Sequence, residues 1–142
     1  MAKLVNLHIY TPYRLFFSGL VEAVVADIAD GQIGILADHT PIMAPLKTSI
    51  LKILDPDGTW KAAAVAEGIL EVTTEGIVIL SAAAEWPEEI NRERALEAKR
   101  QAEEHLQEED LFVFDTLHTR ARLERAKNRL ALLELTQHSK SL

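Results

Sequence analysis

The 142-residue sequence predicts a mainly β N-terminal part, an antiparallel sandwich or flattened barrel, followed by an antiparallel two-helix hairpin. Turn signals recur about every eight to twelve residues with no long helical period between them, which is typical of a sandwich. From Asn91 onward, apolar residues recur instead at spacings of three and four, which predicts helices. Pro87 and the acidic Glu88-Glu89 mark the change, so we expect one domain over 1–87 and another over 88–142.

Short strands are expected wherever side chains alternate or β-branched residues cluster. The first segment, 4–10, places Val5, Leu7 and Ile9 on one face and more polar residues on the other. The other expected strands are 21–26, 50–54, 60–65, 69–72 and 77–80. The sequences Asp55-Pro56-Asp57-Gly58 and Thr73-Thr74-Glu75-Gly76 then predict two hairpin turns.

Each expected helix carries one apolar stripe. In the first helix the stripe is narrow and mostly alanine, which permits close approach of a partner helix but buries little area: Ala95, Ala98, Ala102 and Leu106. In the second helix it consists of Leu123, Ala126, Leu130 and Leu133, preceded by Leu117 and Ala121. The acidic segment Glu108-Glu109-Asp110 is expected to form the bend between the helices.

The net charge of −7 is distributed unevenly. Residues 1–87 and 88–110 each carry −5, whereas residues 111–142 carry +3. The two helices therefore have opposite charge, although exposed ion pairs contribute only about 0–1 kcal/mol each. A hairpin held by small apolar contacts and weak ion pairs is expected to open at low cost.

Composition excludes several classes of function. Without cysteine there is no disulfide, thiolate nucleophile or cysteine-ligated metal site, and the acidic balance disfavours a nucleic-acid binder. We find no Walker loop, dinucleotide-binding glycine pattern, zincin helix or metal-ligand spacing of histidines, so we expect no enzyme and no metal. The longest charge-free stretch has ten residues, 4–13, whereas a membrane helix needs roughly twenty. The start lacks the apolar run of a signal peptide, and we expect a soluble, intracellular protein.

Two constellations stand out from this background. The segment 31–42 has two glycines three apart, an apolar triplet and then Asp38-His39-Thr40-Pro41, which predicts a tight turn, a strand and an exposed loop. This pattern fits loop architecture alone or a binding loop held out by a rigid sheet. On the second helix, Arg122, Arg125 and Arg129 lie along one face, which fits either a solvated basic face or an anion-binding face.

These segments resemble one family closely. Gly-x-x-Gly-Ile-Leu-x-x-His-x-Pro over 31–41, the motif at 66–72, the segment 78–85 and the helical segments 94–103 and 122–130 occur in the order found in the epsilon subunit of the rotary F-type ATP synthase. The resemblance covers essentially the whole chain. It implies a ten-stranded sandwich followed by a helical hairpin.

The resemblance also implies a non-catalytic central-stalk subunit. The sandwich would bind the gamma subunit and rest on the membrane rotor ring of c subunits, helping to couple proton or sodium-ion translocation to ATP synthesis. The hairpin would fold against the sandwich or extend into the catalytic head of alpha and beta subunits, where it inhibits ATP hydrolysis. The expected location is peripheral, on the cytoplasmic face of the bacterial inner membrane.

The family resemblance assigns two sets of residues. The loop that corresponds to the ring-facing surface comprises Gly31, Gln32, Gly34, Asp38, His39 and Pro41. No cofactor is obligatory, but several bacterial members bind a regulatory ATP through an Ile-Asp-x-x-Arg-Ala motif, an Arg-x-x-x-Arg pair and a glutamate before the hinge proline. The matching positions are Glu85, Ile90, Asn91, Arg94, Ala95, Arg125 and Arg129. Asn91 replaces the motif aspartate and can still accept a hydrogen bond, and we expect ATP to hold the hairpin folded.

Two other functions stay open on the residues alone. The chain could be a free-standing nucleotide or anion sensor, or an enzyme of unrecognised type. A sensor would be monomeric in a native extract, whereas a stalk subunit would sediment with a large membrane-attached assembly.

Overall fold

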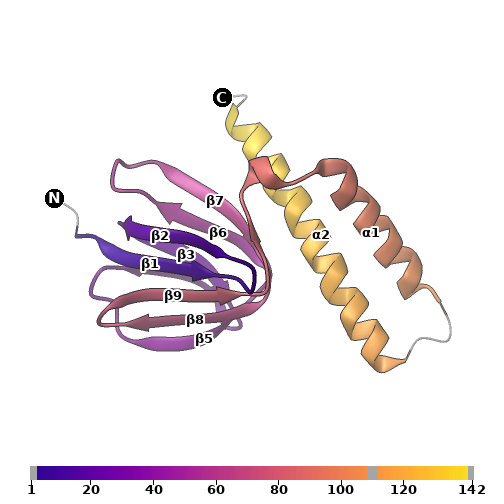
Figure 1. Ribbon diagram of the computed structural model, residues 1–142, viewed down its shortest axis with the longest axis horizontal. Coiled ribbons are helices and arrows are strands. Elements are labelled where there is room, and N and C mark those ends of the chain that lie inside the picture. Colours follow the sequence, from indigo (N-terminus) through magenta and orange to yellow (C-terminus); the bar gives the residue numbers. More distant parts are fainter. Residues whose placement is uncertain (1–2, 109–111, 141–142) are drawn as a thin grey trace. The chain divides into compact units, whose positions relative to one another are not determined.

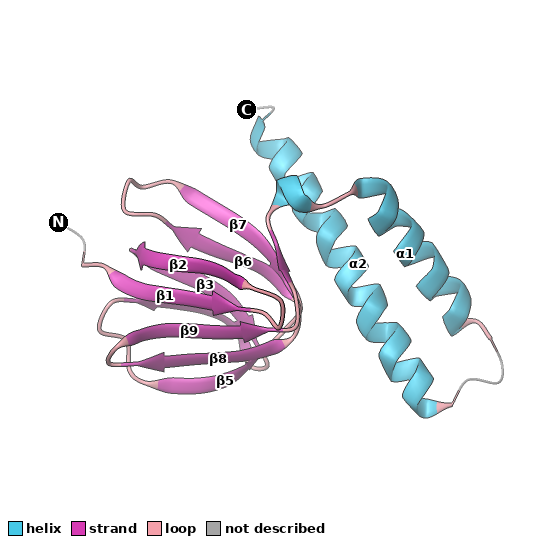
Figure 2. Ribbon diagram, in the orientation of Figure 1, coloured by secondary structure: helices cyan, strands magenta, loops and turns pink. Residues whose placement is uncertain are grey.

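The computed structural model describes residues 3–108 and 112–140 (Figure 1). The chain divides into two compact units between Trp86 and Pro87. The first unit is built from strands and the second from helices, as Figure 2 shows, which confirms the expected fold class.

The first unit contains ten strands. Their bounds are β1 Val5–Tyr10, β2 Leu15–Val21, β3 Ala23–Ile28, β4 Gly31–Leu36, β5 Ile42–Leu46, β6 Ser49–Leu54, β7 Trp60–Val65, β8 Gly68–Thr73, β9 Gly76–Ser81 and β10 Ala84–Glu85. The hydrogen-bonded order is β10-β7-β6-β3-β5-β8-β9-β1-β2, with β4 paired to β3 outside this path. Neighbouring strands run antiparallel except β1 and β9, which run parallel.

The predicted strand 21–26 is wrong. This range combines the last residue of β2 with the first part of β3, and Glu22 separates the two strands. Strand β2 breaks the simple alternation because its register with β1 shifts between Ile9 and Tyr10, where Phe16 is the extra residue.

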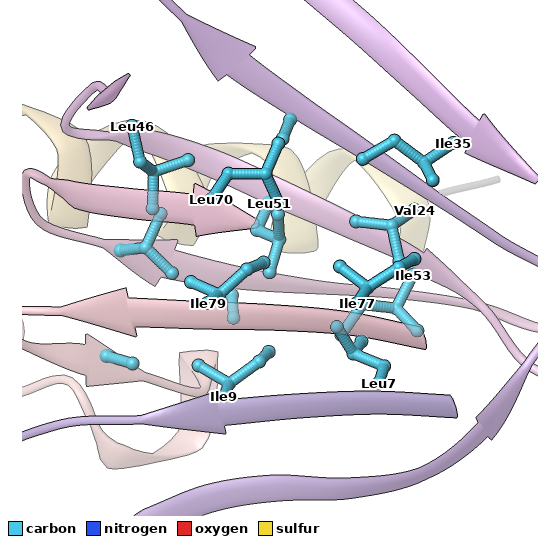
Figure 3. Close-up of a cluster of buried hydrophobic side chains, with 14 of the residues drawn as sticks. Leu7, Ile9, Val24, Ile35, Leu46, Leu51, Ile53, Leu70, Ile77 and Ile79 are labelled. Carbon is cyan, nitrogen blue, oxygen red and sulfur yellow. The ribbon is translucent and has the colours of Figure 1, made fainter. Parts of the chain in front are cut away.

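The core of the sandwich is formed by the inward side chains of alternate positions (Figure 3). The largest fully buried ones include Leu7, Ile9, Ile35, Leu51, Ile53, Leu70, Ile77 and Ile79. Burying one such side chain contributes about 1.5–3 kcal/mol relative to leaving it in water. The predicted inward face of the first strand is confirmed at Leu7 and Ile9, and Val5 packs against the same core half-buried.

An aromatic cluster anchors the end of the first unit. The rings of Phe16 and Trp86 stack with centroids 4.5 Å apart, and the Arg14 guanidinium lies 5.1 Å from the centroid of Phe16. Arg14 Nη2 also donates a hydrogen bond to the Ala84 carbonyl at 3.3 Å. Trp86 is therefore held by the sandwich, directly before the boundary at Pro87.

The second unit consists of a short 3₁₀ turn, η1 (Pro87–Glu89), and two helices, α1 (Arg92–Leu106) and α2 (Val113–Lys140), which lie side by side in Figure 1. Ala95 and Ala102 of α1 are buried, as the predicted stripe requires, and so are Leu123 and Ala126 of α2. Of the bend predicted at Glu108-Glu109-Asp110, the last two residues lie outside the described residues.

The stripe of α2 needs one correction. Leu117 is exposed, and the buried residue before Leu123 is Thr119, because a helical turn of 3.6 residues brings position 119 under position 123. Leu132, which is not part of the predicted stripe, is fully buried, whereas Leu130 and Leu133 are half-buried.

Candidate functional site

The predicted turn before the ring-facing loop is a two-residue hairpin. Strands β3 and β4 pair as far as Ile28 and Gly31, so only two residues lie between these partners. Gly31 has φ +125°, a conformation that glycine adopts without a steric cost. Gly34 does not have a positive φ; it lies within β4, opposite Val25 of β3.

The segment between β4 and β5 is held by local contacts. Asp38 has φ +65°, and its carboxylate accepts a hydrogen bond from Lys3 Nζ at 2.7 Å. This hydrogen bond, with the attraction of the opposite charge, raises the pKa of Lys3. His39 Nδ1 lies 2.6 Å from the Thr40 carbonyl oxygen, which can only accept, so Nδ1 is the donor in this contact.

Most of the predicted ring-contact residues face solvent. Gly31, Gln32, Gly34, Asp38 and Pro41 are exposed, and His39 is half-buried. The sandwich thus presents this segment as an outward-facing surface on a rigid frame.

The predicted ATP-binding residues fall into both units. Glu85 lies on β10 in the first unit, paired with Ala64 of β7. The other six belong to the second unit, around the start of α1 and along α2. Arg94 is exposed, Arg125 and Arg129 are half-buried, and Ala95 is buried as part of the α1 stripe.

Asn91 has a structural role that the family motif alone did not indicate. It is the N-cap of α1, with extended backbone, and its side-chain oxygen accepts a hydrogen bond from the Arg94 amide at 3.0 Å. Asparagine and aspartate are about equally good in this role, so the change from the motif aspartate keeps the cap while it removes a charge. The position of an asparagine directly before an amphipathic pattern was the signal for this cap.

Two of the predicted arginines lie equally far along their helices from the hairpin connection. Arg94 lies twelve residues before Leu106, where α1 ends, and Arg125 lies twelve residues after Val113, where α2 begins. Each separation is about 18 Å at 1.5 Å per residue. Arg129 follows Arg125 one turn later on α2.

Several charged side chains of α1 form ion pairs with one another. Arg100 binds Glu97 and Glu104 on neighbouring turns, with 2.5 Å between its Nη1 and Glu104 Oε1. The hydrogen bonds that Arg100 donates to Glu97 and then to Glu104 raise the pKa of Arg100, and the bonds that Glu97 accepts from Arg100 lower the pKa of Glu97. Arg100 therefore stabilises α1 itself.

No group of three or more His, Asp or Glu side chains in 3–108 and 112–140 is arranged to hold a metal ion. Within the same described part of the chain, neither helix is long and apolar enough to cross a membrane.

Both units match known protein domains. Residues 4–87 match the family described as the ATP synthase delta/epsilon chain, beta-sandwich domain, and residues 88–134 match its long alpha-helix domain. The ATP synthase epsilon chain of Caldicellulosiruptor saccharolyticus is 47% identical over 129 residues, which cover 91% of this chain and 93% of the relative. The epsilon chain of Bacillus licheniformis is 40% identical over 128 residues, covering 90% of this chain and 96% of that one.

A solved structure has the same fold. A chain of the Euglena gracilis mitochondrial ATP synthase, seen by cryo-electron microscopy with OSCP, F1 and the c-ring, superposes with a TM-score of 0.79. The two share 22% sequence identity, and the match covers 92% of this chain and 81% of that one. Since the family domains together span nearly all of the sequence and the curated relatives exceed 30% identity over most of it, this chain belongs to the ATP synthase delta/epsilon chain family.

Proposed function

We propose that this chain is the central-stalk subunit of a bacterial F-type ATP synthase that joins the gamma subunit to the rotor ring. In this position it helps to couple ion translocation to ATP synthesis. Family membership makes it a non-catalytic subunit of that enzyme. The related Euglena chain comes from an assembly that includes the c-ring, which supports the placement.

The sandwich suits a part that transmits torque. Its core is filled by fully buried Leu, Ile and Val side chains, and protein interiors packed in this way are stiff. The proposed contact with the ring is the exposed surface over 31–41, from the start of β4 to the segment before β5, where Lys3 pairs with Asp38. The chain would then be peripheral, on the cytoplasmic face of the inner membrane.

The second unit is proposed to regulate ATP hydrolysis by leaving its folded position and extending into the catalytic head. The buried positions of its helices are mainly small: Ala95, Ala102, Thr119 and Ala126. Small side chains bury little apolar area, at about 25 cal/mol per Å². Moving a two-state equilibrium from 1:99 to 99:1 takes about 5.5 kcal/mol, so contacts of this size can be shifted by a ligand.

ATP is the proposed ligand that keeps the hairpin folded. The observation that carries this proposal is the position of Arg94 in the first turn of α1, with Arg125 and Arg129 one turn apart on α2. At the N-terminus of α1, backbone N–H groups and the helix dipole favour anions. Three arginines together with this helix N-terminus would fit a triphosphate.

Calorimetric titration of the full chain with ATP tests the site. We expect binding heat for the wild type and a strong loss of this heat for Arg94→Ala and Arg125→Ala. Arg120→Ala, at an exposed position of α2, is the control and should show no loss. Asn91→Asp keeps the N-cap but adds a charge near the proposed phosphates, so its ATP affinity reports on that charge alone. Unchanged heat in both arginine variants would show that the site is assigned wrongly.

Co-expression with the gamma subunit tests the stalk role. We expect the chain to co-purify with gamma and, in its native host, to sediment with a large membrane-attached assembly. A chain that stays monomeric in the extract and does not co-purify with gamma would contradict the stalk role and favour the free-standing sensor.

A further inference from the structure

The two units follow one another directly in the chain. Trp86 is the last residue of the first unit, and its ring stacks on Phe16 with centroids 4.5 Å apart. The next residue, Pro87, already begins η1, which belongs to the second unit. Because proline has a fixed φ and restricts the residue before it to extended conformations, the connection between Trp86 and Pro87 is stiff.

The five residues that follow Trp86 are ordered by local hydrogen bonds. The Ile90 amide donates a hydrogen bond to the Pro87 carbonyl at 3.2 Å, which closes the 3₁₀ turn. Asn91 then caps α1 through its bond to the Arg94 amide. We call residues 87–91 the strap, since the stacked Trp86 fixes the position where it begins and the N-cap fixes the position where it joins α1.

The strap leads into α1 but also lies against α2. Within the second unit η1 is in contact with α2, and Figure 1 shows it beside the C-terminal half of that helix. α2 has 28 residues and α1 has 15, so α2 is longer by about 20 Å at 1.5 Å per residue. α1 therefore cannot cover the whole length of α2.

Burial on α2 also extends beyond the stripe that includes Ala126. Leu132 is fully buried, and at 100° per residue it lies about 120° around the helix from Ala126. The C-terminal half of α2 is therefore covered on a second face, in addition to the stripe.

We propose that the strap keeps the C-terminal half of α2 in the folded hairpin. While Trp86 stays stacked and Pro87 keeps the turn in place, η1 stays against α2. Release of α2 then requires its contact with η1 to break, in addition to its contact with α1. The consequence of this step for ATP hydrolysis rests on the regulatory function proposed above, whereas the contact itself can be tested in the chain alone.

Hydrogen exchange of the purified full chain, followed by mass spectrometry of peptides from α2, tests the strap. Pro87→Gly removes the fixed φ and adds backbone freedom, which loosens the turn. We expect exchange in 127–138 to become about tenfold faster, while exchange in 113–123, at the other end of α2, changes by less than about threefold. Pro56→Gly, in the turn between β6 and β7, is the matched control and should leave both segments unchanged.

The anchor of the strap is tested separately. Trp86→Ala removes the stacking partner of Phe16 and should speed exchange in 127–138 as Pro87→Gly does, whereas Trp86→Phe keeps an aromatic ring and should restore most of the protection. Trp60, the other tryptophan, is 54% exposed, so Trp60→Ala controls for the loss of an indole. Circular dichroism checks that each variant is folded, and Phe16→Leu tests the stack if Trp86→Ala unfolds.

The outcomes separate the strap from the regulatory function. Exchange as slow in Pro87→Gly and Trp86→Ala as in the wild type would overturn the proposal, and so would a uniform increase over all of α2, because the variants would then loosen the hairpin as a whole. Inhibition of ATP hydrolysis in the assembled catalytic head is the other readout, and Pro87→Gly should inhibit more strongly than the wild type. Equal inhibition in a variant with fast exchange would contradict the regulatory function and leave the strap in place.

Discussion

Removing the cap of α1 should destabilise the second unit by a predictable amount. In Asn91→Ala, the Arg94 amide loses the side-chain oxygen that accepts its hydrogen bond at 3.0 Å, while the first backbone bond of the helix, from the Ala95 amide to the carbonyl of residue 91, is kept. Replacing an N-cap asparagine by alanine typically costs about 1 kcal/mol, within a range of about 0.5–2. In a unit of this size that loss lowers the melting temperature by about 4–8 °C.

Two optical probes separate the units in this experiment. Both tryptophans, Trp60 and Trp86, lie in the first unit, so their fluorescence follows the sandwich, whereas far-ultraviolet circular dichroism is dominated by the helices. We expect Asn91→Ala to lower the transition seen by circular dichroism and to leave the fluorescence transition in place. If the units unfold together, both transitions shift by the same free energy.

The conservative variant Asn91→Asp should have the opposite effect. Asn91→Asp keeps the oxygen acceptor and places a carboxylate at the positive end of the helix dipole, which should stabilise α1 by about 0.3–1 kcal/mol. If Asn91→Ala is within about 0.3 kcal/mol of the wild type, the hydrogen bond to the Arg94 amide does not contribute as an N-cap does, and the reasoning is refuted.

Three further predictions concern the sandwich and the surface of α1. A Cβ at Gly68 would lie 1.8 Å from the Leu80 carbonyl oxygen, so Gly68→Ala should lower the free energy of unfolding by several kcal/mol. Gly34 has open space around it, so Gly34→Ala should change this free energy by at most about 1 kcal/mol. Urea denaturation followed by tryptophan fluorescence compares the two variants, and equal midpoints would contradict the clash. Ile79→Ala, at a fully buried position, should cost about 2–5 kcal/mol in the same assay, and a cost below 1 kcal/mol would mean that the core closes around the gap. Arg100 lowers the pKa of Glu97 from its ordinary 4.5, so the stabilisation of α1 by Glu97 is present above pH 4.5 and is lost as the pH falls through the lowered pKa. Glu97→Gln should remove this part of the acid sensitivity of α1. An unchanged pH profile of the circular dichroism transition would show that the pair of Glu97 and Arg100 contributes nothing.

Local sequence patterns predicted the elements whose signal is contained in a few neighbouring residues. The strand at 60–65 and the alternation of Leu7 and Ile9 were recognisable because side chains on a strand alternate between two faces. Strand β5 gave no such signal, since it contains Pro45, which has no N–H for a strand ladder. It is accommodated in a strand that forms a continuous ladder with β8 and only one registered pair with β3.

The sequence predicted which residues form the candidate site, but it did not predict where they lie along the helices or which contacts they make. The spacing of Arg125 and Arg129 placed them on one helix face, and the family motif added Arg94. Their distances from the helix ends depend on where α1 and α2 begin and end, which the stripe pattern did not define to the residue. The capping bond of Asn91 and the pair of Lys3 with Asp38, 35 residues apart, also needed the backbone geometry.

Amino-acid order alone was sufficient to predict a sandwich followed by a helical hairpin and the family, because periodicity, turn chemistry and motifs are properties of neighbouring residues. The tertiary structure decided which strands pair and in which register. It set β1 parallel to β9 and so placed Tyr10 beside Leu80, although the two residues lie 70 positions apart in the chain. Such neighbours exist only when hydrogen bonds between distant strands fix their register, since a slip of one residue would turn every side chain of a strand to the opposite face.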